Sequence, residues 1–326
     1  MVSTQFSANS LVLDPAAATE EIQNHIRHSV QHVLRKRGVV VAMSGGIDSS
    51  AVAALCVRAL SPARVFGLLM PETDSSPEST NLARKLAEQL GIRYTIEDIS
   101  PTLNALGCYQ RRDDAIRSVI PEYGPDWKSK IVLPNLVNGS QYSVFSVVAQ
   151  SPDGRTVTAR LNAEAYLTIV AATNFKQRTR KMLEYYHADR LNYAVTGTPN
   201  RLEYDQGFFV KNGDGSADVK PIAHLYKTQV YQLAAHLGVP AEILRRPPTT
   251  DTYSLDQSQE EFYFALPYDK MDVCLYARNN NIPAEEAAAA CGLTPEQVER
   301  AFEIIDTKRT STRYLHQAPL LVNPIF

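Results

Sequence analysis

Residues 39–50 read Val39-Val40-Val41-Ala42-Met43-Ser44-Gly45-Gly46-Ile47-Asp48-Ser49-Ser50, and this stretch decides the fold. The short apolar, β-branched run at its start is typical of a central strand in a parallel sheet. Two glycines follow at once, where the chain can turn tightly and let a ligand approach its backbone. From Asp48 the pattern becomes helical, with Val52, Leu55 and Leu60 on one side. The stretch therefore predicts a strand, a glycine turn and the start of a helix.

The predicted turn suits an anion, most often phosphate, because a helix N-terminus offers unpaired N–H groups and a partial positive charge. Asp48 adds a carboxylate through which Mg²⁺ could bridge to that phosphate. The Gly-Lys-Ser/Thr ending of a Walker A loop is absent. Residues 44–49 instead resemble the Ser-Gly-Gly-x-Asp-Ser pyrophosphate loop of the N-type ATP pyrophosphatases, which split ATP between the α and β phosphates. The alternative is an ordinary glycine turn between a strand and a helix.

Length and composition limit the possible functions. The chain has 326 residues and a formal net charge of -2, which allows one large α/β domain or two modest ones. The near-neutral balance argues against a general nucleic-acid or membrane surface. None of the four cysteines forms a CxxC pair, so we expect free thiols in a reducing cytoplasm rather than a zinc site or disulfides. We find no signal-peptide pattern and no apolar run long enough to span a membrane.

The order of the remaining elements predicts an α/β fold. Strands at 65–70 and 94–99 alternate with helices, a pattern typical of parallel pairing with right-handed crossovers. A long helix at 164–186 and a fourth strand at 193–196 follow, and the C-terminal part is helical. We therefore expect a doubly wound, mostly parallel sheet with C-terminal helices, in a single domain spanning residues 1–326.

One segment does not fit this alternation. Residues 142–149 and 156–161 flank Ser151-Pro152-Asp153-Gly154, which predicts a β-hairpin. Proline, glycine and polar residues interrupt the pattern over 120–140, where no element is predicted. Because a hairpin is foreign to a plain βαβ array, we interpret 120–162 as an insertion.

The ordered motifs resemble the ammonia-dependent NAD synthetase family, roughly over residues 20–100 and 165–320. The first motif alone would also fit GMP synthetases, asparagine synthetases or tRNA thiolation enzymes, and the Gly-Asp-Gly-x-Ala-Asp loop with its neighbours narrows the choice. The resemblance implies an adenine nucleotide alpha hydrolase-like fold. The motifs are Ser44 to Ser49, Asn174 to Arg180, Gly197-Thr198 with Glu203, Phe208 to Asp218, Leu225 to Thr228, and Pro248-Thr249.

The resemblance also implies a reaction, the ligation of ammonia to a carboxylate. In that family the carboxylate of deamido-NAD attacks the α-phosphate of ATP and pyrophosphate leaves. Ammonia then displaces AMP from the acyl-adenylate, which gives NAD. Because an anion attacks an anion, backbone dipoles, a lysine and Mg²⁺ must offset the charge.

Site residues are carried over from the same resemblance. Asp48 and Glu203 would hold Mg²⁺, Asp214 would lie near the ammonia position, and Asp48, Asp214 and Lys227 would be the catalytic set. The acceptor acid would be bound by Arg178, Lys211, Asp218 and Lys308. The ATP contacts would be Ala42, Met43, Ser44, Gly45, Gly46, Ile47, Asp48, Ser49, Thr198, Lys227 and Thr249.

Two departures from the family pattern leave the acceptor open. Thr307 stands where the family often has His, and 120–162 has no counterpart that we recognise in the compact bacterial enzymes. One alternative is therefore a related ligase that amidates another carboxylic acid. A tRNA-modifying ATP pyrophosphatase is disfavoured by the charge of -2 and the isolated cysteines. A non-catalytic nucleotide-binding module is disfavoured by Asp48, Glu203 and Lys227.

The partners expected from the resemblance are deamido-NAD, ammonia and a second copy of the chain. A homodimer is also weakly indicated by the apolar helix at 166–170. No glutaminase-like domain is recognisable, so ammonia would come free or from a separate glutaminase. We expect no nucleic-acid partner.

Overall fold

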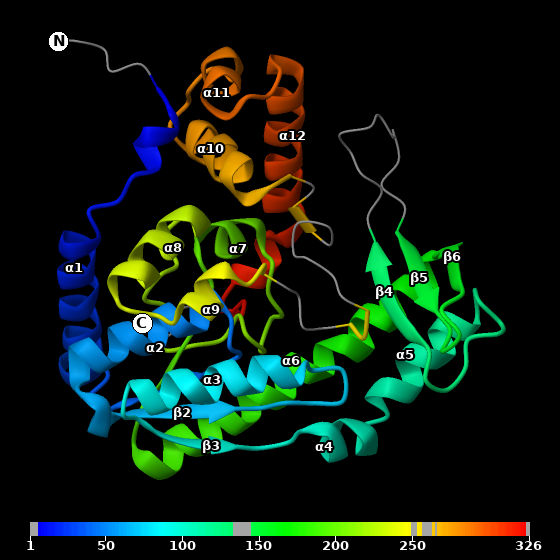
Figure 1. Cartoon of the computed structure of the whole chain (residues 1–326), viewed down its shortest axis with the longest axis horizontal. Coiled ribbons are helices and arrows are strands. Elements are labelled where there is room, and N and C mark those ends of the chain that lie inside the picture. Colours follow the sequence, from blue (N-terminus) through cyan, green and yellow to red (C-terminus); the bar gives the residue numbers. More distant parts are fainter. Residues whose placement is uncertain (1–5, 133–144, 249–252, 256–262, 265, 324–326) are drawn as a thin grey trace.

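The computed structural model describes residues 6–132, 145–248, 253–255, 263–264 and 266–323. Its centre is a parallel sheet with the strand order β3-β2-β1-β7, which confirms the expected parallel arrangement (Figure 1). The strands are β1 (Val39–Ala42), β2 (Val65–Leu69), β3 (Arg93–Ile96) and β7 (Ala194–Thr196). The third strand, predicted at 94–99, ends earlier at Ile96, although the Glu97 N–H still donates to the Leu69 carbonyl at 2.8 Å.

Helices cover both faces of this sheet, as expected for a doubly wound fold. Successive side chains of a strand point to opposite faces. Val39 and Val41 pack against one layer of helices and Val40 against the other, which explains the unbroken apolar run. The first layer is α1 (Pro15–His28), α2 (Ile47–Leu60), α3 (Pro77–Gln89), α8 (Lys227–His236) and α9 (Ala241–Arg245). The second layer is α4 (Ser100–Ala105), α5 (Cys108–Arg117) and α6 (Ala163–Leu191).

The strand order fixes where a ligand can bind. The chain moves outward from β1 to β2 and β3, and then returns to the other side of β1 as β7. In open α/β sheets, ligands bind at such a reversal, outside the carboxyl ends of the strands. The glycine turn after β1 and the Gly197-Thr198 segment after β7 both lie there.

A second, antiparallel sheet lies beside the parallel one. It has the order β4-β5-β6, with β4 (Lys128–Val132), β5 (Ser146–Gln150) and β6 (Thr156–Arg160). The predicted hairpin is confirmed as β5 and β6. The sequence pattern did not identify a strand over 120–140, where the structure has β4. Its pattern was hard to recognise because only Ser129 and Ile131 are deeply buried, and one of these is polar.

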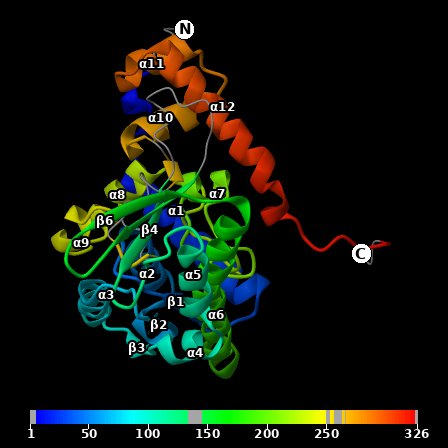
Figure 2. The same ribbon diagram turned by 90° about the vertical axis from the view of Figure 1, so that its right-hand side faces the viewer.

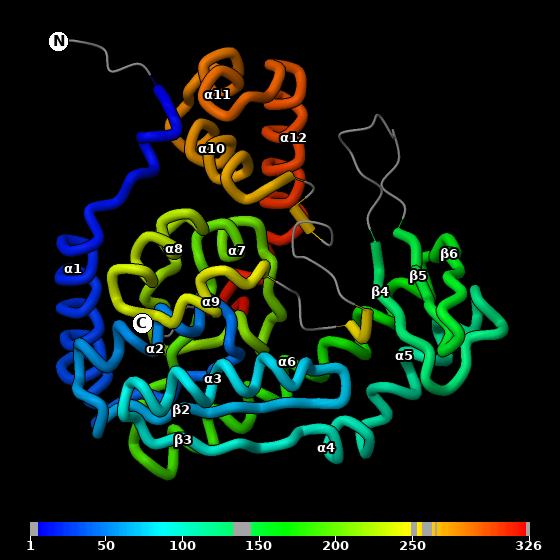
Figure 3. The backbone as a smooth tube through the Cα atoms, viewed as in Figure 1, coloured from blue at the N-terminus to red at the C-terminus, as the bar shows by residue number. Residues whose placement is uncertain are grey.

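The long helix α6 connects the two sheets (Figure 3). It is capped by Asn162, whose side chain accepts a hydrogen bond from the Ala165 N–H at 2.8 Å, and it ends at Asn192 with a φ of 54°. Its first turns pack with the antiparallel sheet and its last turns with the parallel sheet. The helix thereby forms one wall of the space above β1.

The C-terminal helices form a unit with its own apolar core (Figures 1 and 2). They are α10 (Tyr268–Asn279), α11 (Ala284–Cys291) and α12 (Pro295–Thr312), and Leu202 of α7 (Arg201–Gln206) packs against them. Among the described residues, no helix is both long and apolar enough to cross a membrane.

Candidate active site

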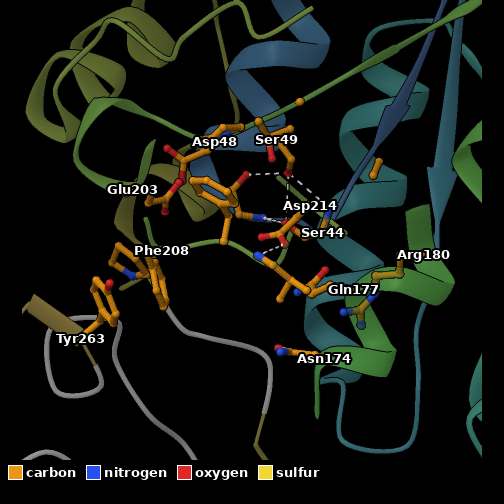
Figure 4. A pocket seen from close by; sticks show the side chains of 18 of the residues that line it. Ser44, Asp48, Ser49, Asn174, Gln177, Arg180, Glu203, Phe208, Asp214 and Tyr263 are labelled. Atoms are coloured by element: carbon orange, nitrogen blue, oxygen red, sulfur yellow. Dashed lines mark hydrogen bonds between the residues drawn. The ribbon is translucent and has the colours of Figure 1, made fainter. Parts of the chain in front are cut away.

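A cavity of about 1180 Å³ opens at the carboxyl ends of β1, β2 and β7. Its wall is built from parts distant in sequence: the glycine turn, one side of α6 and the loop after α7 (Figure 4), together with α12. Pockets for a single small ligand typically measure about 300–1,000 Å³. The cavity is therefore large enough for more than one substrate.

The glycine turn forms the floor of the cavity. Gly45 has a φ of 77°, and a Cβ at this position would lie only 2.2 Å from the carbonyl oxygen of Ser79. This residue must therefore be glycine, although it does not itself line the cavity. The turn is braced by Ser49, whose hydroxyl lies 3.2 Å from that of Ser44 and donates to the Gly46 carbonyl at 3.1 Å. The expected residues that do line the cavity here are Ala42, Met43, Ser44, Gly46, Ile47, Asp48 and Ser49.

Asp48, Glu203 and Lys227 meet at one end of the cavity. Lys227 Nζ lies 2.5 Å from Asp48 Oδ2 and 3.9 Å from Glu203 Oε1. The two carboxylates line the cavity, whereas the lysine is completely buried behind them. Figure 4 shows Asp48 and Glu203 close together on the side opposite Asn174, Gln177 and Arg180 of α6.

When both carboxylates are ionised, two negative charges face one ammonium group at this end. Burial and, after it, the neighbouring Asp48 carboxylate raise the pKa of Glu203 to about 8. Burial lowers the pKa of Lys227, but Asp48 and Glu203 outweigh it and hold the pKa above its usual value. An excess of negative charge on hard oxygen atoms is what a divalent cation would relieve. Within the described residues, no group of three or more His, Cys, Asp or Glu side chains could hold a metal ion.

Asn200 holds the two carboxylates in place, and the sequence analysis missed it. Its Nδ2 donates to Asp48 Oδ1 at 3.0 Å, and its Oδ1 accepts from the Glu203 N–H at 3.1 Å. The Glu203 side chain in turn accepts from the Asn200 N–H. This capping box was detectable, because Asn followed three residues later by Glu is a signal for a helix start.

The expected acceptor-binding residues fall into two groups. Arg178, Lys211 and Lys308 line the cavity, and Arg178 Nε donates to the Lys211 carbonyl at 3.3 Å. Asp218 does not line the cavity. Its Oδ2 instead accepts from the Val195 N–H at 2.8 Å, which fastens the Gly-Asp-Gly loop to β7.

Lys308 is a cation in apolar surroundings. Its Nζ donates to the Tyr263 carbonyl and lies 3.8 Å from the centre of the Tyr263 ring and 5.3 Å from that of Phe264. Burial lowers the pKa of Lys308 to about 7. The group therefore gains and loses its proton near neutral pH.

Asp214 lies in the cavity wall near these groups. Its Oδ1 accepts from the Val210 N–H at 2.8 Å, which orients the carboxylate. Burial raises its pKa, and the Val210 N–H and the charges of Lys181 and Arg180 act in the opposite direction. Thr198 also lines the cavity, whereas Thr249 lies outside the described residues.

Several lining residues were not identified from the sequence. One is Tyr263, which stacks with Phe208 of the Phe208 to Asp218 motif, with ring centres 4.6 Å apart, and the pair forms one side of the cavity (Figure 4). Helix α12 adds a row of lining residues, of which only Thr307 and Lys308 were singled out in the sequence. These are Arg300, Glu303, Ile304, Thr307, Lys308, Ser311 and Thr312.

Comparisons with known proteins identify the family of the chain. The sequence model of a family described as NAD synthase matches residues 18–119 and 142–314. The NH(3)-dependent NAD(+) synthetase of Rhizobium meliloti (strain 1021) is 59% identical over 320 residues, which are 98% of this chain and 96% of that protein.

Solved structures share the fold at lower identity. NMN synthetase from Francisella tularensis superposes with a TM-score of 0.66 at 23% identity, covering 97% of this chain and 100% of that one. The NH3-dependent NAD synthetase from Campylobacter jejuni, in complex with the nitrate ion, gives a TM-score of 0.62 at 23% identity, with 95% and 100% covered. The match of the family model over most of the sequence, together with the high identity to a full-length relative, shows that the chain belongs to the NAD synthase family.

Proposed function

We propose that this protein catalyses the ATP-dependent amidation of deamido-NAD with ammonia, through an acyl-adenylate. One observation carries the proposal: a pyrophosphate-type loop, a carboxylate pair, an oriented Asp214 and the cations Lys211 and Lys308 all border one cavity. The relative at 59% identity bears the name of this activity. The products would be NAD, AMP and pyrophosphate.

The first step joins two anions, so the chain must offset negative charge. A carboxylate oxygen of the acid forms a bond to the α-phosphorus of ATP, and the bond from that phosphorus to the bridging oxygen of pyrophosphate breaks. We assign Ser44 to Ser49 to the pyrophosphate, because the N-terminus of α2 faces the cavity there. We assign Lys227 to the charge that develops at this end.

The second step requires uncharged ammonia at the acyl carbon. The C–N bond forms as the bond between the acyl carbon and the oxygen of AMP breaks. We assign Asp214 to holding ammonium and taking up its proton, because its carboxylate is oriented by the Val210 N–H and borders the cavity. Arg178, Lys211 and Lys308 would bind the anionic dinucleotide, since cations form charge-assisted hydrogen bonds with phosphates.

Asp48 and Glu203 fit a magnesium ion. Both offer carboxylate oxygens to the same end of the cavity, and together they carry more negative charge than Lys227 neutralises. Mg²⁺ commonly uses one or two carboxylates and completes its shell with water and substrate phosphates. When bound, the ion would neutralise phosphate charge and orient ATP.

We further propose a homodimer that forms through α6. The outer face of this helix exposes Leu167, Met182 and Tyr186, which are 62%, 59% and 58% accessible. A shallow apolar groove between α5 and α6 borders Leu167, Phe175 and Arg178. Arg178 also borders the large cavity, so a partner there would lie next to the proposed acceptor site.

A cytoplasmic location is also part of the proposal. The four cysteines are free thiols, which suits a reducing compartment. The ammonia source would be free ammonium or a separate glutaminase.

The acceptor needs a direct test, because the fold is shared with an NMN synthetase. Purified protein should release pyrophosphate with ATP, Mg²⁺ and ammonium when deamido-NAD is supplied, and much less with the corresponding mononucleotide acid. Asp48→Asn and Glu203→Gln should each abolish release, because each removes a negatively charged metal ligand.

The matched control is Asp98→Asn, which changes an exposed carboxylate after β3 that does not line the cavity. It should retain full activity. Turnover with another acid but none with deamido-NAD would show that deamido-NAD is not the acceptor and that the other acid is. Near-normal rates in either carboxylate variant would show that the metal assignment is wrong.

A further inference from the structure

Lys227 must be held in one position for its proposed role, because its side chain is long and flexible and its charge acts from behind Asp48 and Glu203. It is the first residue of α8 and is completely buried. Asp48 holds the ammonium end of the side chain. The backbone at the start of α8 must also be fixed, because it sets the direction in which the lysine leaves the helix.

The start of α8 is fixed from a different part of the fold. Asp272 of α10 points its Oδ2 at the first turn of α8, where it accepts from the Thr228 N–H at 2.7 Å. The first N–H groups of a helix lack partners within the helix, so this bond satisfies a group that would otherwise be unpaired. The contact joins residues 44 positions apart in the sequence.

The same helix also supports the other end of the lysine. Tyr268 lies one turn before Asp272 on α10, and residues four apart share a helical face. Lys227 Nζ lies 5.3 Å from the centre of the Tyr268 ring, within the range of a cation–π contact. Helix α10 therefore holds Lys227 at two places. The Tyr268 ring lies beside its ammonium group, and Asp272 accepts a hydrogen bond from the backbone at the start of α8.

An aspartate is unusual at a fully buried position that has only a structural role. Asp272 is completely inaccessible to solvent, and its Oδ1 has no hydrogen-bond partner within the described residues. The residues beside it on α10, such as Met271, Val273 and Leu275, are apolar and belong to the core. Burying a carboxylate with an unpaired oxygen is unfavourable, so a well-packed apolar residue would serve stability better.

We infer that Asp272 is a positioning residue for the reaction, which holds the start of α8 so that Lys227 Nζ stays against Asp48 and Glu203 at the ATP end of the cavity. The inference rests on the proposed role of Lys227 in adenylation. Asp272 would also connect the ATP end of the cavity with the proposed acceptor side, because the C-terminal helical unit that contains Asp272 supplies Lys308 from α12.

The test separates the hydrogen-bond acceptor from the bulk of the side chain. Asp272→Leu keeps the number and branching of the side-chain heavy atoms and suits the apolar core but removes the acceptor, whereas Asp272→Asn keeps an acceptor oxygen. We expect Asp272→Leu to lower kcat for pyrophosphate release roughly tenfold or more, since small misplacements of catalytic groups have effects of this size. Its KM for deamido-NAD should stay unchanged. Asp272→Asn should restore most of the rate.

A purely structural role predicts a different result. Both variants would then melt at lower temperature but turn over normally per folded molecule, and that outcome would overturn the inference. Equal loss of kcat in the Leu and Asn variants would also overturn it. The matched control is Asp269→Leu, an exposed aspartate on the same helix, which should leave kcat unchanged.

A second variant keeps the inference testable if Asp272→Leu does not fold. Tyr268→Leu removes the ring beside Lys227 Nζ and should lower kcat without changing the KM for deamido-NAD. Wild-type kinetics in this variant would then overturn the inference. Absence of turnover in the wild type would instead contradict the proposed function, so the two failures are distinguishable.

Discussion

Lys308 makes the site sensitive to pH at the scale of a single residue. Burial lowers the pKa of Lys308 to about 7. Above this pH the Lys308 side chain is therefore mostly uncharged in the protein without bound ligand. A bound anion favours the charged form and must therefore be accompanied by proton uptake. The wild type should bind deamido-NAD more weakly as the pH rises above about 7.

The effect can be measured by calorimetry in buffers of different ionisation enthalpy. The wild type should take up protons on binding deamido-NAD at mildly alkaline pH. Lys308→Met should bind weakly at every pH and take up no protons at this group. Unchanged proton uptake in Lys308→Met would assign the titration to another residue.

Single residues also show what the sequence can and cannot predict about a site. The pyrophosphate loop was predictable because its signals lie within a few consecutive residues. Sequence alone did not show that Asp48 and Lys227, 179 positions apart, would form an ion pair. Nor did it reveal that Asp218 would hydrogen-bond to the β7 backbone, because a motif gives residue types but not the direction of side chains.

The helix α6 has two functional faces. Its inner face lines the cavity through Asn174, Gln177 and Arg180, and its outer face exposes the apolar stripe that includes Leu167 and Met182. The sequence predicted the helix but not this division, because both faces are of mixed polarity. The strand β4 was missed for a related reason: its burial pattern depends on α5 and α6 packing beneath it.

The apolar stripe gives a prediction for the whole helix. If α6 forms the dimer interface, Met182→Glu would bury an unpaired charge there and should dissociate the dimer. Light scattering at micromolar concentration should show the wild type as a dimer and Met182→Glu as a monomer. Val33→Glu is the control, because Val33 is 65% exposed but lies outside α6. A monomeric wild type would contradict the proposed interface.

On the scale of the whole molecule, the cavity exists only where three units meet. The loops at the end of the parallel sheet supply the phosphate loop and the carboxylates, α6 supplies Asn174, Gln177 and Arg180, and the C-terminal helices supply Lys308. The doubly wound sheet was predictable because strand and helix periodicity are local. The position of the C-terminal unit was not, since it depends on contacts such as that of Asp272 with the start of α8.

The proposed function depends on one step, the transfer of AMP from ATP to the carboxylate of deamido-NAD in this cavity. The most direct test uses deamido-NAD whose carboxylate is labelled with heavy oxygen, with ATP and ammonium. Mass spectrometry of the products should find one labelled oxygen in AMP, none in pyrophosphate, and the other in the amide of NAD. Label in inorganic phosphate or pyrophosphate, or NAD formed without labelled AMP, would contradict the account.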